Sequence, residues 1–564
     1  MKPMPLEGEE AGWLAGQAGQ ETSREHVETS REHVETSREH VEAAQETSQE
    51  LVRHSAIISL FNGLGVLGGL ILDMVMAALF GAGRATDGFF LAFTVPQFIM
   101  LVLQSSYVSA LVPVLTGLRE GEPARAWTVF SRLLNLNGLL MGGLAVLGWL
   151  SAGWITALVG AGLDPSQHGE ITWLTRVLFL MLPPLALAEV MRVQLNALER
   201  FAEPAAANVL RYVGALATLL AGTRVWGIRA LALGYVVGAL AQAGLSAVAV
   251  ARAGGRYRFS WSLSDPDVRV AMRLFAVRAG GIGLRRSGLI FERFLACFLP
   301  TGSVTALSYA RRVSLALFQV FASSVSTAAL PTLSASAQAE DWPALRRSLC
   351  LGYRLLSYVT WPAAALMAAL SVPLVRVLFQ RGAFEAGNTA LTAALLAIYA
   401  LGVPALALVE LLLTPHYTWR DARTPTYHMA WMLGANIVLA WALMRLGGAY
   451  GLAWASTLTA LLSMARGYWL LRHLGGLDFG SYTARVVSAA CMAGLAAWGG
   501  WRLAGHLMGT GSAVGALLAS AAVGTLGGLL YLLAGQWLGL DEWPRLRQWV
   551  RGTRGARQAI GDKR

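Results

Sequence analysis

Long apolar segments recur along almost the whole chain and restrict its possible folds more than any other feature. Fourteen such segments, each of about 20 residues, begin near residues 55, 88, 129, 171, 204, 226, 267, 302, 347, 387, 424, 449, 484 and 512. A helix of this length crosses the roughly 30 Å hydrocarbon core of a bilayer and satisfies its own backbone polar groups. Only 14% of the residues are charged and 55% are hydrophobic, too apolar a balance for a soluble fold. We therefore predict an all-α membrane protein of about fourteen transmembrane helices.

Basic residues are distributed unevenly between the predicted loops. One set of alternate loops has pairs or clusters of arginine, such as Arg346 with Arg347 and Arg420 with Arg423, and the C-terminal tail adds more. The other set has mostly isolated arginines. Cytoplasmic loops of membrane proteins are enriched in Lys and Arg, so we predict that both termini are cytoplasmic. This topology accounts for the formal net charge of +12, so the charge does not indicate a nucleic-acid partner.

An internal repeat divides the predicted helices into two sets. The pattern Gly-x-x-Thr-x-x-x-aromatic begins at Gly83 and again at Gly302, and the pattern Ala-Leu followed by Pro begins at Ala110 and again at Ala329. Six helices separate the copies, so the copies share one orientation, as in transporters whose substrate path lies between two parallel lobes. We predict an N-lobe at 55–252 (helices 1–6), a C-lobe at 253–475 (helices 7–12), two C-terminal helices at 476–540, and a central cavity.

The two ends of the chain are polar. Residues 21–41 are three copies of Glu-Thr-Ser-Arg-Glu-His-Val, with one apolar residue per heptad where a stable coiled coil needs two. We therefore predict that 1–54 is a solvated, dispensable cytoplasmic tail and that 541–564 is a basic cytoplasmic tail.

No arrangement of residues suited to catalysis or to a metal is found in the sequence. The loops predicted to be non-cytoplasmic are poor in acidic residues, and Asp164, His168 and Glu170 in one loop fit solvated positions. The three cysteines, Cys297, Cys350 and Cys491, are scattered through apolar segments without metal-ligand spacing. We expect no enzyme activity and no cofactor.

Charged residues inside predicted spans are informative, because a charge near the bilayer centre costs about 2.5 kcal/mol or more without a polar cavity or a partner. The seventh span has arginines and one glutamate at seven-residue intervals, and the eighth has two adjacent arginines. Guanidinium groups bind phosphates by two parallel hydrogen bonds, so a cavity lined by them suits an anionic diphosphate. The candidate substrate-binding residues are Arg312, Arg311, Arg285, Arg286, Arg293, Asp73 and Asp87. Alternatively, the arginines pair internally with Glu292, Asp73 or Glu410, or extend to the cytoplasmic surface.

Three motifs are similar to those of a known transporter family: LFGAGRATDGFFLAF at 79–93, GSVTALSYARR at 302–312 and LFQRGAF at 378–384, followed by Tyr417, Asp421 and Thr424-Pro425. Over roughly residues 55–475 the chain resembles the MurJ (MviN) lipid II flippases of the multidrug/oligosaccharidyl-lipid/polysaccharide exporter superfamily. The resemblance implies fourteen helices around a V-shaped central cavity in the bacterial inner membrane. It also implies that undecaprenyl-pyrophosphate with the peptidoglycan disaccharide-pentapeptide moves from the cytoplasmic to the periplasmic leaflet.

The chain departs from the family pattern at the positions of several arginines. Two arginines usual in the family's first helix align with Val66 and Leu72, and a pair usual in its second helix aligns with Met100 and Leu101. The eighth-helix arginine is retained as Arg312. These substitutions remove the N-lobe half of the anion site, so either the seventh-helix arginines rebuild it or the substrate is not lipid II.

The leading hypothesis is a flippase for an undecaprenyl-pyrophosphate-linked glycan, with lipid II as the first candidate, acting in peptidoglycan and cell-wall synthesis and so in cell shape. The alternatives are an exporter of another lipid-linked polysaccharide precursor and a non-transporting envelope scaffold with a degenerate cavity. Two other classes are disfavoured. An exporter of small organic cations would have carboxylates in its cavity, whereas the charges within the spans are mainly arginines. A membrane glycosyltransferase would need an acidic site, and the sequence has none. Cell-envelope synthesis proteins are candidate partners.

Overall fold

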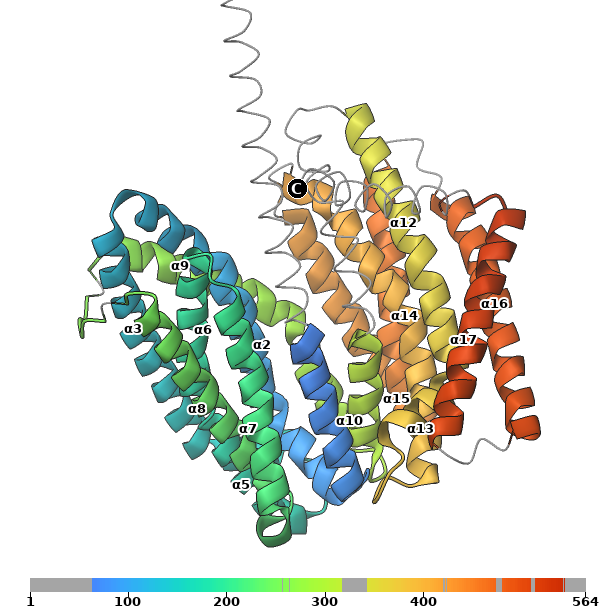
Figure 1. Ribbon diagram of the computed structural model, residues 1–564, viewed down its shortest axis with the longest axis horizontal. Helices are drawn as coiled ribbons and strands as arrows, with labels where there is room; N and C mark the ends of the chain where they lie inside the picture. Colours follow the sequence, from blue (N-terminus) through green and yellow to red (C-terminus); the bar gives the residue numbers. More distant parts are fainter. Residues whose placement is uncertain are drawn as a thin grey trace, which may run out of the picture. The chain divides into compact units, whose positions relative to one another are not determined.

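The computed structural model describes residues 63–255, 257–262, 264–316, 342–418, 421, 423–472, 479–508, 513–540 and 542. These residues form α-helices joined by turns, without a β-strand among them (Figure 1). The N-terminal tail, the C-terminal tail except residue 542, and the second copy of the Ala-Leu-Pro repeat at Ala329 lie outside the described residues. Their assignments stay predictions.

The first bundle contains the helices up to residue 286. They are Gly63–Phe80, α2 Arg84–Gly121, α3 Pro123–Leu150, α4 Ala152–Val159, α5 Pro165–Phe179, α6 Leu182–Ala197, α7 Ala202–Trp226, α8 Arg229–Arg252 and α9 Pro266–Arg286. Helix α7 packs along α8, and α6 packs on α2, α3 and α8 (Figure 1).

The second bundle contains the remaining helices. They are α10 Gly288–Ala296, the helical residues 303–316, α12 Trp342–Ala369, α13 Ser371–Phe379, α14 Ala386–Thr418, α15 Arg423–Leu471, α16 Phe479–Met508 and α17 Ala513–Trp537. Helix α14 packs on α12 and α15, while α16 packs on α12 and α17.

Many of these helices can cross a bilayer. Within the described residues, nine are long and apolar enough, and the pair α12–α13, bent by 71°, would make a tenth. Helix α15 has a break at Gly448, whose φ of 55° is not helical, so it corresponds to two predicted spans. Large apolar side chains such as Leu147, Trp154 and Trp537 are exposed, as expected for helices surrounded by lipid. The all-α membrane fold is confirmed, and the count of fourteen stays a prediction.

The seventh predicted span is divided into two helices at Ser287. Helix α9 packs mainly on α2 in the first bundle, whereas α10 packs on α15. The break falls in a segment with Gly283, Ser287 and Gly288. These residues have low helix propensity, so interrupting the helix here costs little free energy. Arg278, Arg285 and Glu292, the residues at seven-residue intervals in this span, therefore do not lie along one helix, because the glutamate is in α10.

The beginning of α9 is attached to the first bundle by charged residues. The Asp265 carboxylate accepts hydrogen bonds from the backbone N–H groups of Asp267 and Val268, and it pairs with Arg132 of α3. Arg125 of α3 pairs with Asp267 at 2.7 Å. Helix α9 is thus held by the first bundle, although the predicted lobe boundary after residue 252 assigns it to the C-lobe.

Glycines bring the backbones of the two bundles together near residues 81 and 382. Gly81 and Gly382 have φ values of +64° and +57°, a region that glycine adopts readily. A Cβ at Gly81 would lie 2.3 Å from the carbonyl oxygen of Ala383, and one at Gly382 would lie 2.2 Å from that of Ala78. The Ala383 N–H donates to the Ala78 carbonyl at 2.9 Å. Two of the family-like motifs therefore form one backbone contact.

The two copies of the glycine–threonine repeat also meet. Asp87 of α2 accepts hydrogen bonds from the backbone N–H groups of Gly302 (2.5 Å) and Thr305 (2.8 Å) and from the Thr305 hydroxyl. The rings of Phe90 and Tyr309 pack edge to face, with centroids 5.6 Å apart. A carboxylate is favoured at a helix N-terminus, so Asp87 caps the 303–316 helix from the other bundle.

This cap predicts the effect of replacing Asp87. Asp87→Asn removes the charge from three hydrogen bonds, and the change should cost on the order of 1.5–3 kcal/mol of stability. Thermal unfolding of the purified protein in detergent should show a lower Tm. Asp164→Asn, at a carboxylate that caps its own helix α5, is the matched control and should have a smaller effect. An unchanged Tm in Asp87→Asn would show that this cap does not stabilise the contact between the bundles.

Candidate functional site

An ion pair between Arg312 and Asp73 joins the two bundles. Arg312 lies in the 303–316 helix, Asp73 lies in Gly63–Phe80, and the closest nitrogen and oxygen are 2.5 Å apart. The Asp73 side chain is 4% exposed, whereas the Arg312 side chain is 29% exposed. The second Asp73 oxygen has no hydrogen-bond partner among the described residues. The arginine can thus be reached from outside, although its carboxylate is buried.

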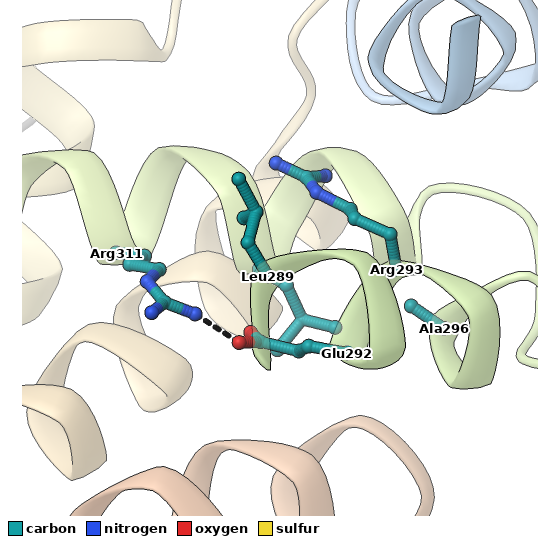
Figure 2. Close-up of a pocket in the computed structure, with 6 residues that line it drawn as sticks. Leu289, Glu292, Arg293, Ala296 and Arg311 are labelled. Atoms are coloured by element: carbon teal, nitrogen blue, oxygen red, sulfur yellow. Dashed lines mark hydrogen bonds and ion pairs between the residues drawn. The ribbon is translucent and has the colours of Figure 1, made fainter. Parts of the chain in front are cut away.

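A second pair lies within the second bundle. Arg311 pairs with Glu292 of α10, and the Tyr399 hydroxyl of α14 donates to the other Glu292 oxygen at 2.8 Å. Figure 2 shows Arg311 and Glu292 pointing toward one another across a pocket. The pocket is lined by Leu289, Glu292, Arg293, Ala296, Leu307 and Arg311. Both adjacent arginines are therefore held by internal carboxylates, the alternative that the sequence left open.

Arg293 follows Glu292, and its guanidinium lies apart from the Arg311–Glu292 pair (Figure 2). Its buried guanidinium donates to the Val304 carbonyl at 3.2 Å and to the Ser308 hydroxyl. It also lies 5.2 Å from the centroid of the Phe90 ring, a favourable cation–π distance. Arg293 therefore fastens α10 to the 303–316 helix and to α2.

Arg285 and Arg286 occupy the last turn of α9, where the helix dipole favours positive charge. Both side chains are exposed, and neither forms an ion pair with a carboxylate in the described ranges. Arg286 lies within electrostatic range of Arg285, Arg311 and the Glu410 carboxylate, with which it forms no ion pair. These arginines therefore extend the positive charge of the Arg311 pocket.

The remaining predicted site residue, Asp87, serves the bundle contact. One of its oxygens accepts a hydrogen bond from Gly302 and the other accepts hydrogen bonds from Thr305. Its carboxylate is therefore engaged in the contact between the bundles. The structure brings Arg311, Arg312, Arg293 and Asp73 together around the 303–316 helix and keeps Asp87 at the beginning of that helix.

One buried arginine in the first bundle was not among the predicted site residues. Arg211 of α7 is 6% exposed, and its guanidinium donates to the Asn208 side chain at 2.9 Å and to the Tyr212 hydroxyl at 3.0 Å. It also contacts the sulfur of Met100 in α2 at 3.6 Å. A guanidinium thus lies beside position 100, although it comes from another helix. Its position within the fifth predicted span is the sequence feature that could have identified it, because a charged residue in a span needs a partner or a polar cavity.

The positive charge of this site suits an anionic ligand. Where the chain is described, no group of three His, Cys, Asp or Glu side chains could hold a metal ion. Guanidinium groups remain positively charged in proteins and present several N–H donors in a fixed plane. Such donors match the oxygens of a phosphate or carboxylate ligand.

The sequence is similar to a known protein family and to named relatives. The family model described as "Lipid II flippase MurJ" matches residues 76–518, most of the chain. A Vibrio cholerae protein named "Probable lipid II flippase MurJ" is 28% identical over 475 residues, which cover 81% of this chain and 90% of that protein. A Synechocystis protein with the same name is 26% identical and covers 83% of this chain and 91% of its own length.

Solved structures show the same fold. "Lipid II flippase MurJ, inward closed conformation" matches with a TM-score of 0.71 and 20% identity, covering 86% of this chain and 99% of that chain. An inward-facing multidrug resistance MATE family transporter of the MOP superfamily matches with a TM-score of 0.61 and 13% identity, covering 75% and 96%. Since the family model matches well over half of the sequence, the family is established: the chain belongs to the MurJ family of lipid II flippases.

Proposed function

We propose that this protein moves an undecaprenyl-pyrophosphate-linked glycan, with lipid II as the first candidate, from the cytoplasmic to the periplasmic leaflet of the bacterial inner membrane. The observation that supports this most is the pair of adjacent arginines, Arg311 and Arg312, in a member of the MurJ family. The glycan would then enter peptidoglycan synthesis.

The two carboxylates would hold the arginines until the substrate arrives. A diphosphate is an anion with several acceptor oxygens, so it competes with Asp73 for Arg312 and with Glu292 for Arg311. A buried ion pair gains little net free energy, because its attraction is offset by the loss of hydration. A phosphate that replaces a carboxylate keeps the arginine paired, whereas an unpaired buried arginine would cost several kcal/mol. The displaced carboxylate must then gain a proton or water, because it would otherwise be a buried unpaired charge.

The exchange would also couple binding to movement of the bundles. Asp73 belongs to the first bundle and Arg312 to the second, so a phosphate that takes over Arg312 removes one interaction between them. A ligand shifts a conformational equilibrium only through different interactions with the two states. Loss of this pair supplies such a difference for alternating access.

The proposed direction of transport depends on the orientation of the chain. Arginine-rich alternate loops and the basic C-terminal tail support cytoplasmic positions for both termini. The named relatives are called probable lipid II flippases, and we expect this protein to transport its glycan without altering it.

Another lipid-linked polysaccharide precursor is the second candidate substrate. Val66, Leu72 and Met100 replace arginines that the family pattern has in its first two helices. A different glycan on the same diphosphate carrier would use the same Arg311 and Arg312 pairs, so these pairs alone do not select the sugar.

Depletion of the protein in its own bacterium tests the substrate. If lipid II is carried, lipid II should accumulate, because its use on the far side of the membrane depends on transport. The measurement is extraction and mass spectrometry of undecaprenyl-linked intermediates during depletion. Accumulation of another undecaprenyl-linked glycan with normal lipid II would identify the second candidate. Unchanged levels of all such lipids would contradict a flippase.

Complementation of the depleted cells tests the arginines. Arg312→Ala and Arg311→Ala should each weaken substrate binding by about tenfold or more, since a charge-assisted hydrogen bond contributes about 1.5–3 kcal/mol, and growth should fail. Lysine at either position should restore function only partly, because its ammonium group lacks the planar set of N–H donors that a guanidinium presents.

Two controls separate binding from folding in this experiment. Arg224→Ala changes an exposed arginine of α7 and should complement fully. Arg312→Ala combined with Asp73→Asn avoids an unpaired buried carboxylate, so it should insert at normal levels and still fail. Normal growth with the double variant would show that Arg312 has only a structural role.

A further inference from the structure

Arg211 is a buried positive charge without a matching negative charge. Its side chain lies inside the first bundle, and its Nε has no hydrogen-bond partner among the described residues. Nη2 donates to Asn208 and Tyr212, while Nη1 has the weak acceptor sulfur of Met100. Neutral acceptors satisfy part of the guanidinium but do not cancel its charge. Arginine does not lose its proton in proteins, so the charge persists.

The buried carboxylates described in the first bundle already have other partners. Asp73 pairs with Arg312, and Glu189 pairs with Arg192 in α6. Asp87 caps the 303–316 helix. Isolating a charge from water costs several kcal/mol unless an opposite charge is near. The environment of Arg211 therefore favours the arrival of an anion.

Arg211 lies near the Arg312–Asp73 pair. Tyr212, whose hydroxyl accepts a hydrogen bond from Arg211, lies within electrostatic range of Arg312. Tyr235 of α8 is within range of Arg211, Asp73 and Arg312. Tyr212 also packs against Gly69, one turn before Asp73. Tyr212 and Tyr235 thus lie near both guanidinium groups, one from each bundle.

The flexible side chain of Met100 covers one end of the Arg211 guanidinium. Its side chain is only partly buried and it contacts Nη1 of Arg211 from α2. Methionine is unbranched and adapts its shape readily. Displacing the thioether exposes N–H donors of Arg211 without breaking the hydrogen bonds to Asn208 and Tyr212.

We propose that Arg211 is a second anion-binding residue, which holds the diphosphate of the lipid-linked substrate from the first bundle while Arg312 holds it from the second. This inference rests on the proposed function and identifies where the first bundle supplies its cation. The guanidinium comes from α7 and not from the first two helices, where Val66, Leu72 and Met100 are apolar.

Binding to the purified full chain in detergent tests this assignment. The probes are undecaprenyl diphosphate, undecaprenyl monophosphate and inorganic pyrophosphate, and the readout is the ligand-dependent rise in Tm. Arg211→Met should bind undecaprenyl diphosphate at least tenfold more weakly than wild type, while its ligand-free Tm stays the same or rises because an uncompensated buried charge has gone. Arg211→Lys should bind with intermediate affinity.

Arg192→Met is the matched control from the same bundle. Arg192 is paired, so its removal leaves Glu189 buried and alone. This variant should have a lower ligand-free Tm but wild-type affinity, the opposite pattern to Arg211→Met. Arg211→Met combined with Met100→Arg moves the guanidinium to the contacting position and should recover much of the affinity.

The outcomes separate this inference from the proposed function. If wild type binds undecaprenyl diphosphate and Arg211→Met binds it equally well, Arg211 is structural and the inference is overturned. If wild type binds none of the three probes, the proposed function itself fails. Arg211-dependent binding of pyrophosphate alone would support recognition of the diphosphate group, whereas dependence limited to undecaprenyl diphosphate would support recognition together with the lipid.

Discussion

Compensation of guanidinium charge inside a membrane-spanning structure is the constraint on which the rest of this protein depends. Arg311 and Arg312 are neighbours on one helix, yet they are neutralised by Glu292 in one bundle and by Asp73 in the other. A low-dielectric environment makes each unpaired charge expensive. The carboxylates therefore keep the arginines paired in the empty protein, and an anionic ligand can take their place as the partner of each arginine.

The bundles meet through two kinds of contact with different properties. Gly81 and Gly382 allow backbones to touch, and Asp87 caps a helix of the opposite bundle. The glycine contact depends on close backbone fit, and the Asp87 cap depends on hydrogen bonds to backbone N–H groups. The Arg312–Asp73 pair depends on charge, and an anionic ligand can replace one side of it. Transport under this account needs the charge contact to change first, because the substrate acts on it directly.

The general fold could be predicted from sequence because apolar length and the requirement to satisfy backbone hydrogen bonds act locally along each span. The partners of the arginines were named only as alternatives, since 239 residues separate Asp73 from Arg312. The break at Ser287 was missed because the helical spacing of Arg278, Arg285 and Glu292 was given more weight than the neighbouring glycines. Arg211 was missed for a different reason: its contact with Met100 joins positions 111 residues apart, and no spacing rule reveals it.

Transport by the purified protein in liposomes tests the central claim most directly. Fluorescent lipid II would be incorporated with wild-type protein, with the Arg312→Ala/Asp73→Asn variant or without protein. An impermeant reductant would then measure how much label reaches the outer leaflet with time. The account predicts movement with wild type that exceeds protein-free liposomes, and none above that level with the variant. Equal rates in all three preparations would contradict the claim that these arginines carry a lipid-linked diphosphate across the membrane.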